Sequence, residues 1–339
     1  MKFDFVIGNP PYQGENDANH NRMPPVYHYF MDNAFKIGEV VELITPARFL
    51  FNAGFTPKDW NNKMLKDEHF KVLHYEPESK RIFSNTDIKG GVAISYRATN
   101  KNFGIIDTFT PYMLLNEIFK KISNMPNFKS IETIMSGRDL FHYTKTCFDA
   151  FPNMKSRNNN NNVVNSNAFE KFPEVFQKEK KQITDIKVTG RIKSVRETRY
   201  IKKEYLDNNQ FLGKHKVIIA QANGSGALGE TLSPPLLGEP EEGFTDTFIC
   251  IGMFDSQVES KNCLKYIKTK FARALLAVLK VTQSMTKDKW HFVPIQDFTN
   301  TSDIDWSVPV KAIDQQLYKK YGLSQEEIDF IETNVKEME

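Results

Sequence analysis

An apolar run near the start of the chain, residues 3–8, ends abruptly at Asn9-Pro10-Pro11-Tyr12. Proline fixes its own φ and has no backbone amide to donate, so neither a strand nor a helix continues through two of them. The run therefore predicts a short buried strand that stops at Asn9. Open α/β sheets bind their ligands at the carboxyl ends of strands, so Asn9 would lie where a ligand is expected.

The first hundred residues alternate between strand-like and helix-like segments. Apolar residues recur about one turn apart over 26–37, directly after Pro25, which predicts a helix. Further segments are predicted as strands at 40–45, 70–75 and 90–98, as a helix at 57–67, and as a polar loop at 13–25. This order is typical of an α/β layer with a largely parallel sheet.

Composition limits the class of protein. The chain has 339 residues, 40% of them hydrophobic, which suits one large or two ordinary domains. The three cysteines, Cys147, Cys250 and Cys263, are far apart and odd in number, and the seven histidines are scattered. This pattern argues against a disulfide framework or a metal site and fits a cytoplasmic protein. We expect no membrane span and no signal peptide.

The composition changes near residue 100, where residues 98–102 favour a domain boundary. Beyond it, helices are predicted at 111–122 and 257–280, and a capping box at Ser324 should open a last helix. Residues 178–216 hold twelve Lys or Arg against five Asp or Glu, a net +7, while the rest of the chain carries −4. Such a run is often only a solvated surface, but this excess is local and interleaved with aromatic residues, which favours DNA.

A turn is the simplest interpretation of residues 9–12, because Asn and Pro are common where strands end. The two prolines also stiffen the backbone, so the Asn9 side chain and the Pro10 carbonyl become neighbouring acceptors beside the Tyr12 ring. Two acceptors and a ring suit a planar base with an exocyclic amine. Accepting both hydrogens would favour a tetrahedral nitrogen whose lone pair can point at an incoming methyl group. A base in a duplex reaches such a site only by flipping out.

The sequence at this point resembles motif IV of the N6-adenine DNA methyltransferases, in the subgroup whose catalytic motif follows the cofactor motif. Residues 40–51 are similar to the strand-and-proline segment that comes next, and residues 83–96 to the last strand hairpin of the catalytic domain. Residues 266–298 and 313–332 resemble the carboxyl-terminal part of restriction–modification methylases of type II and IIG.

The resemblance implies an α/β fold with two domains. Residues 1–105 would form the C-terminal half of a Rossmann-like methyltransferase sheet, and residues 106–339 an α+β target-recognition domain. The implied activity is site-specific DNA adenine N6-methylation with S-adenosylmethionine, within a restriction–modification system. The implied catalytic residues are Asn9, Pro10, Pro11 and Tyr12, with Tyr12 stacked on the flipped adenine. Phe83 is a candidate for the other face of the base, although a core phenylalanine is the simpler interpretation.

The family also carries a glycine-rich S-adenosylmethionine loop and an acidic ribose-binding residue upstream of this motif, but only eight residues precede Asn9 here. Three explanations stay open: a fragment of a longer enzyme, one half of a split enzyme, or a remnant that binds DNA without chemistry. The expected partners are double-stranded DNA and an upstream cofactor-binding half or a restriction endonuclease, with no membrane.

Residues 224–229 match the spacing G-x-G-x-x-G after a strand-like segment, which alone would suit a nucleotide-dependent oxidoreductase. Such a loop needs a helix directly after it. Residues 230–243 contain paired prolines and two further glycines, which exclude one. We therefore expect a glycine-rich hairpin or loop, and neither a dinucleotide site nor the missing cofactor loop.

The family places its target-recognition domain in the second half of the chain, where the basic segment lies. Phosphate contacts would supply affinity there, and a few side chains at base edges would read sequence. The candidate DNA-binding residues are Lys187, Arg191, Lys193, Arg196, Arg199, Lys202 and Lys203, with Lys280, Lys287 and Lys289 as secondary candidates. A DNA-specificity module without chemistry is the alternative function.

Overall fold

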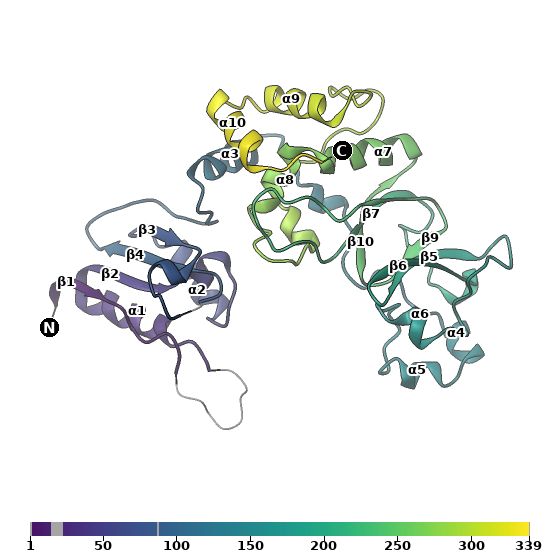
Figure 1. The fold of residues 1–339 in the computed structure, drawn as a ribbon, viewed down its shortest axis with the longest axis horizontal. Coiled ribbons are helices and arrows are strands. Elements are labelled where there is room, and N and C mark those ends of the chain that lie inside the picture. The colour runs from purple at the N-terminus through teal and green to yellow at the C-terminus, as the bar shows by residue number, and fades with distance from the viewer. Residues whose placement is uncertain (1, 15–22, 87, 339) are drawn as a thin grey trace. The chain divides into compact units, whose positions relative to one another are not determined.

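The fold is described from a computed structural model that covers residues 2–14, 23–86 and 88–338 (Figure 1). The chain divides into two compact units, unit 1 over Met1–Met113 and unit 2 over Leu114–Glu339. Most of the predicted loop 13–25 lies outside the described residues. In the part of the chain that is described, no helix is both long and apolar enough to cross a membrane.

Unit 1 is built on a four-stranded sheet of order β1-β2-β4-β3. The strands are β1 (Phe3–Gly8), β2 (Gly38–Pro46), β3 (Phe70–Glu76) and β4 (Val92–Ala98). β1 and β2 pair in parallel, whereas β4 runs antiparallel to β2 and to β3. The expected largely parallel sheet is thus corrected. Three strands share one direction, but two of the three pairings are antiparallel because β4 lies between β2 and β3.

Two helices cover one face of this sheet. The helical elements of unit 1 are α1 (Tyr27–Ile37), α2 (Lys58–Leu65) and the 3-10 turns η1 (Ala47–Phe51) and η2 (Ser79–Arg81). Met31 of α1 and Met64 of α2 are buried in one core with Val41 of β2. The chain passes from α1 into β2 at Gly38, where a Cβ atom would lie only 2.7 Å from Val41 Cγ2. This close approach requires glycine.

β1 is not the buried strand that its apolar sequence predicts. Phe3, Phe5 and Ile7 are 45%, 68% and 78% exposed. They are exposed because β1 is an edge strand and no described helix covers the face on which these three side chains lie. Val6, which points to the opposite face, packs against the core.

Unit 2 contains two three-stranded sheets, of order β10-β7-β8 and β6-β5-β9. Their strands are β5 (Ile186–Ile192), β6 (Val195–Ile201), β7 (His215–Ala220), β8 (Leu236–Gly238), β9 (Glu242–Phe244) and β10 (Phe248–Phe254). Val217 and Ile219 of β7 pack in one hydrophobic cluster, while Ile218 and Ala220 pack in another. β7 is therefore buried on both faces, which accounts for its unbroken apolar sequence.

The helices of unit 2 form two groups around these clusters. The first group consists of the longer helices, which are α3 (Met113–Ser123), α7 (Gln257–Lys268), α8 (Lys270–Ala277), α9 (Val310–Lys320) and α10 (Gln325–Asn334). The second group consists of the short helices α4 (Lys145–Ala150), α5 (Met154–Arg157) and α6 (Ala168–Lys171), which pack beside β5 and β6 (Figure 1). The 3-10 turns are η3 (Ile131–Ile134), η4 (Lys203–Tyr205) and η5 (Lys287–Trp290).

The single helix predicted over 257–280 is broken at Thr269 into α7 and α8. Thr269 has a ψ of 149°, outside the helical range, and its side chain accepts a hydrogen bond from the Ala272 amide. The Asp314 carboxylate accepts from the amides of Lys270 and Phe271. The first turn of α8 is therefore capped by two side chains. The capping box predicted at Ser324 is confirmed and opens α10.

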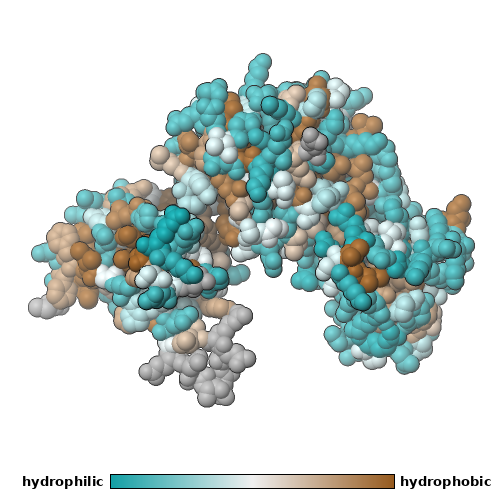
Figure 2. All heavy atoms as spheres, in the orientation of Figure 1, coloured by the Kyte–Doolittle hydropathy of each residue, from teal (hydrophilic) through white to brown (hydrophobic). Residues whose placement is uncertain are grey.

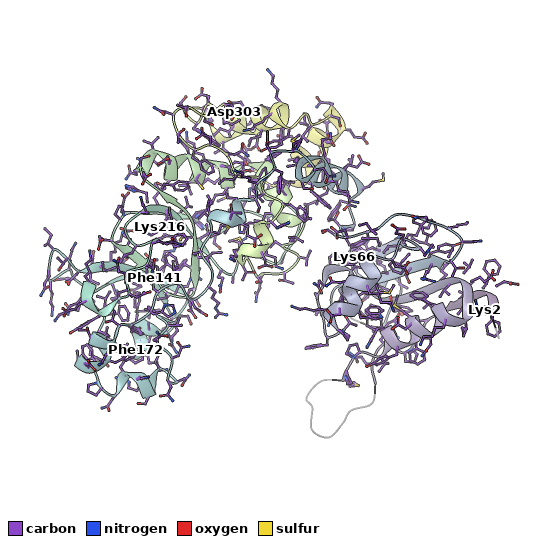
Figure 3. All side chains as sticks on the ribbon, turned by 180° about the vertical axis from the view of Figure 1, so that it is seen from behind. Lys2, Lys66, Phe141, Phe172, Lys216 and Asp303 are labelled. Carbon is purple, nitrogen blue, oxygen red and sulfur yellow. The ribbon has the colours of Figure 1, made fainter. Side chains whose placement is uncertain are left out.

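Three cations are buried among the described residues of unit 2, and two of them, Lys216 and Arg273, are satisfied by backbone carbonyls. Lys216 of β7, labelled in Figure 3, donates to three of them at 2.9–3.1 Å. Burial lowers the pKa of Lys216 to about 8. Arg273 of α8 is 2% exposed and donates to the carbonyls of Gly229, Glu230, Lys268 and Lys336.

Candidate functional site

Residues 9–12, the corner directly after β1, are held at both ends by pairing and backbone hydrogen bonds. On one side, Gly8 is paired with Leu43 of β2. On the other, the Val26 amide donates to the Tyr12 carbonyl at 3.1 Å and the Gly14 amide to the Pro24 carbonyl at 2.9 Å. Asn9, between these two anchors, is exposed. The corner therefore presents the Asn9 side chain at the carboxyl end of a parallel strand, with an open approach from solvent.

The structure brings Tyr12 and Phe83 together. Their ring centroids are 6.3 Å apart with an interplanar angle of 71°, an edge-to-face contact of the kind that aromatic pairs favour. The Tyr12 hydroxyl is buried and has no hydrogen-bond partner among the described residues. Burial raises the pKa of Tyr12 to about 12, so the phenol is neutral at ordinary pH. A base placed between the two rings would require one of them to turn.

A cavity of about 210 Å³ lies beside Tyr12, bounded also by Tyr27, Pro46 and Arg48. Asn9 and Phe83 do not line this cavity, so it lies on a different side of Tyr12 from Phe83. Sites for drug-sized ligands span roughly 300–1,000 Å³. This smaller space is on the scale of a single chemical group or ring.

Arg48 at this cavity was not among the predicted site residues. It follows the carboxyl end of β2, the parallel neighbour of β1, and its Nε donates to the Lys89 carbonyl. A Cβ atom on Gly90, at φ +87°, would lie 2.7 Å from the Arg48 side chain, so this glycine makes room for the arginine. The signal that could have found Arg48 is its position after a second parallel strand, at the same edge of the sheet as Asn9.

The basic segment folds largely into the β5–β6 hairpin. Arg191 and Arg196 are register partners across the two strands, and both guanidinium groups lie over the Phe248 ring, at 5.6 and 5.7 Å. Neither arginine has a carboxylate within ion-pair distance in the described part of the chain. Burial and the neighbouring Arg191 lower the pKa of Arg196. Two adjacent cations without a counter-ion make this a suitable place for an anion.

Other predicted DNA-binding residues are engaged in ion pairs. Lys187 pairs with Glu242 at 2.7 Å, Lys203 with Glu241 at 2.8 Å, Lys202 with Glu204 at 3.8 Å, and Arg199 with Glu197. Lys193 is exposed at the hairpin turn with φ +47°, and Lys287 is exposed at the start of η5. Lys289 pairs with Asp288. The hairpin therefore concentrates its uncompensated charge at Arg191, Lys193 and Arg196.

Lys280 differs from the expectation that it faces DNA. It is 3% exposed, and its ammonium group is held by Glu230 and by the carbonyls of Asn223 and Thr282. A cation enclosed in this way cannot meet a phosphate unless its surroundings open. Lys280 instead belongs to the glycine-rich segment of residues 224–229.

That segment is a loop without a helix after it, which confirms the expected glycine-rich loop. The amides of Ser225 and Gly226 donate to the Glu230 carboxylate. The backbone of this segment also lies close to a neighbouring segment, because a Cβ atom on Gly226 would lie 2.3 Å from the Thr282 amide nitrogen. The amides that a phosphate would need are thus occupied by the chain's own carboxylate. This removes the only sequence support for an oxidoreductase.

Comparison with known proteins gives a family match over the first part of the chain. Residues 1–83 match the model described as the Eco57I restriction-modification methylase. A protein of Mycoplasma pneumoniae described as an uncharacterized adenine-specific methylase is 28% identical over 144 residues, which cover 42% of this chain and 31% of the relative. The chain thus spans about a third of the length of this curated relative.

A solved structure, the type IIG restriction endonuclease BpuSI, aligns over 95% of this chain and 49% of its own, with 11% sequence identity and a TM-score of 0.35. A likeness of this size carries no argument about fold or activity. The assignment therefore depends on the two sequence matches, of which the family match over residues 1–83 includes Asn9 to Tyr12. The resemblance predicted from the sequence is confirmed: the chain is similar to the adenine methylases of restriction–modification systems.

Proposed function

We propose that this chain holds the target base of a site-specific DNA adenine N6-methyltransferase in a restriction–modification system. The observation that carries the proposal is the exposed Asn9 at the carboxyl end of a parallel strand, followed by Pro10, Pro11 and Tyr12. This corner lies inside the segment that matches the methylase family.

The proposed role of the corner is to accept both hydrogens of the adenine exocyclic amine. The Asn9 side-chain oxygen would take one and the Pro10 carbonyl the other, which draws electron density onto the nitrogen and favours a tetrahedral geometry. The methyl donor would be S-adenosylmethionine, which supplies an electrophilic methyl group. A new N–C bond replaces the donor's S–C bond, and the amine then loses one proton to solvent. No side chain needs a shifted pKa for this step.

Tyr12 and Phe83 would receive the flipped base. A duplex base has to leave the stack before its amine can reach Asn9, and aromatic rings compensate for the lost stacking. Tyr12 is half-buried and so is fixed in place, while its ring contacts Phe83 by an edge. One ring can therefore turn to admit the base while the other supports it.

The β5–β6 hairpin is the proposed DNA-contacting surface of unit 2. Arg191, Lys193 and Arg196 offer charge without carboxylate partners, and Lys287 offers an exposed cation elsewhere in the unit. We assign a supporting role to the ion-paired Lys187, Arg199, Lys202 and Lys203, because each would have to leave its carboxylate partner to bind a phosphate. Lys280 is left out because it is buried.

The glycine-rich segment of residues 224–229 offers no free amides for a methyl donor. It is filled by Glu230, and no other glycine-rich loop among the described residues leads into a helix. This observation supports two candidates. Either another polypeptide segment brings the donor, as we propose, or the chain is a DNA-specificity module without chemistry. The second predicts salt-sensitive DNA binding and no methyl transfer under any condition.

The experiment measures transfer of a labelled methyl group from S-adenosylmethionine to unmethylated genomic DNA, with the polypeptide encoded directly upstream also supplied. Asn9→Ala should lower the rate by about 100-fold or more. Asn33→Ala, which removes an exposed asparagine side chain on α1, is the matched control and should not change it. An Asn9→Ala rate equal to that of the unchanged chain would contradict the mechanism, and absence of transfer in every combination would favour the specificity module.

A further inference from the structure

Unit 2 contains a cavity of about 730 Å³ among α7, α8, the start of α9 and the chain beyond α10. This volume is within the roughly 300–1,000 Å³ of small-ligand sites. We call it the α7–α9 cavity, and its walls come from residues 261–273, 309–314, 332 and 337–338. The described residues that line it lie outside the corner after β1 and the β5–β6 hairpin. The proposed function therefore does not use this cavity.

One face of α7 forms a wall of the cavity. Lys261, Leu264, Lys265 and Lys268 line it, and their spacing of three and four residues places them on the same side of the helix. Tyr266, on another side of α7, is fully buried in the core of the unit. The same helix therefore anchors the unit through one face and presents cations to the cavity through another.

Side-chain hydrogen bonds hold the walls together. The Lys265 ammonium group donates to the carbonyls of Trp306, at 2.6 Å, and Val308, at 3.2 Å, which ties α7 to the segment before α9. The Lys270 ammonium group pairs with the Glu332 carboxylate at 2.6 Å and ties α8 to α10. The cavity is thus formed without a ligand, so a ligand would have to order few side chains on binding.

The lining of the cavity is positively charged. Six of the lining residues are Lys or Arg and three are Asp or Glu, an excess of three positive charges. Arg273 is 2% exposed and donates to four carbonyls, and no carboxylate of the described chain lies within ion-pair distance of it. Two of the three carboxylates, Asp314 and Glu332, already accept hydrogen bonds from Lys270. A recess with this excess attracts an anion.

Three charged side chains of the cavity are exposed and available to a ligand. Lys261 on α7, Lys311 on α9 and Glu337 beyond α10 have no hydrogen-bond or ion-pair partner within the described ranges. Lysine ammonium groups bind phosphate oxygens. A carboxylate accepts hydrogen bonds from ribose hydroxyls, as acidic residues do in dinucleotide sites. These three side chains therefore match the phosphates and the sugar of a nucleotide.

Apolar side chains complete the cavity. Leu264 of α7, Val310 of α9 and Met338 line it and are half-buried. In Figure 2, hydrophilic and hydrophobic spheres lie side by side over the part of unit 2 where Figure 1 places α7 and α9. Small-ligand sites combine apolar walls with a few polar groups that fix orientation. An apolar wall of this kind can cover the face of a planar base.

We propose that the α7–α9 cavity binds a nucleoside diphosphate or triphosphate. The phosphates bind Lys261 and Lys311, the ribose hydroxyls donate to Glu337, and the base lies against Leu264 and Val310. A ligand with several negative charges suits the excess of positive charge better than a monoanion does. S-adenosylmethionine suits it poorly, because its sulfonium group is a cation. The cavity is therefore a site separate from that of the methyl donor.

The test is isothermal titration calorimetry of residues 1–339 with ATP in the absence of divalent cations. Lys261→Glu and Lys311→Glu should each weaken ATP binding by about tenfold or more, because each variant removes a charge-assisted hydrogen bond and adds repulsion. Lys319→Glu is the matched control, since Lys319 is exposed on α9 and does not line the cavity, and it should leave the affinity unchanged. Thermal unfolding without ligand should be the same for the three variants.

Inorganic triphosphate and S-adenosylmethionine are the comparison probes. Tighter binding of ATP than of either probe would support the proposal. Equal affinity for ATP and inorganic triphosphate would overturn the nucleotide assignment, because the base and sugar would then contribute nothing. Equal losses in Lys311→Glu and Lys319→Glu, or no ATP binding at all, would overturn the site itself. None of these measurements depends on methyl transfer, so a failure of the proposed function leaves this proposal intact.

Discussion

Unit 1 and unit 2 bury their apolar side chains to very different extents. Among the described residues, twelve large apolar or tyrosine side chains are exposed in unit 1 and four in unit 2, although unit 2 is about twice as long. Unit 2 even encloses Lys216 and Arg273 by surrounding them with carbonyls. Unit 2 therefore covers nearly all of its own large apolar side chains, whereas unit 1 keeps a larger number of them on its surface. The two units should respond differently to mutation.

The largest effect is expected at the closed interior of unit 2. Arg273→Leu would remove a side-chain donor from four backbone carbonyls, of which that of Gly229 keeps the Lys336 amide, and should lower the free energy of unfolding by about 3 kcal/mol. Denaturant titration followed by circular dichroism measures this change. Arg138→Leu, at a side chain that is 60% exposed, is the control and should cost less than about 1 kcal/mol. Similar losses for the two variants would show that unit 2 does not depend on its buried cation.

The next effect depends on pH and concerns Lys216. Burial holds its pKa at about 8, whereas 10.5 is the ordinary value, so between these pH values the unfolded chain binds the proton more strongly. Stability should therefore rise with pH through that window, by on the order of 1–2 kcal/mol between pH 8 and 9.5. Below pH 8 the penalty is present in full. Lys216→Met should remove this rise, which unfolding curves at several pH values would test. An unchanged slope would mean that another group titrates.

A smaller effect is expected on DNA binding by the hairpin. Arg191→Ala or Arg196→Ala should each weaken duplex binding by about tenfold and reduce the salt dependence by about one unit of slope. Lys203→Ala should do less, because Lys203 is already paired with Glu241. Fluorescence anisotropy at several salt concentrations distinguishes these cases. Equal losses at Arg191 and Lys203 would show that the existing ion pairs do not weaken phosphate contact.

The smallest effect is expected at Tyr12. Its hydroxyl is buried without a partner, so Tyr12→Phe should change the free energy of unfolding by less than about 0.5 kcal/mol. It should also preserve methyl transfer, because the proposed role of the residue is stacking. Tyr12→Ala should lower transfer, since it removes the ring. A strong loss in Tyr12→Phe would assign the hydroxyl a role that stacking does not explain.

Local sequence predicted most elements of unit 1 and the helices near both ends of unit 2. The apolar period over 26–37, the proline at residue 25 and the glycine at residue 38 are local signals, and α1 follows them. The insertion of β4 between β2 and β3 could not be predicted in this way, because strand order depends on contacts between distant residues. The break at Thr269 likewise depends on Asp314, 45 residues further along the chain.

The candidate site likewise has a part that local sequence predicts and a part that depends on the fold. The end of the strand before Asn9 could be predicted because its signal lies in four consecutive residues, and the role of those residues stays a prediction. The DNA-binding set could not be resolved further, because charge alone does not show which cations have partners. Lys280 and Arg196 are both basic, yet one is enclosed by Glu230 and the other lies over Phe248 without a carboxylate. Arg48 was missed because its place beside Tyr12 depends on the fold of the second strand.

The position of β4 has a consequence for how unit 1 forms during synthesis. Among the described strands of the unit, β4 is the last to leave the ribosome, and it joins β2 to β3. Until Ala98 has emerged, β3 lacks the strand with which it pairs, whereas α1 and α2 can already pack on β2. A nascent-chain arrest series should therefore show protease resistance appearing abruptly once β4 clears the exit tunnel, rather than strand by strand.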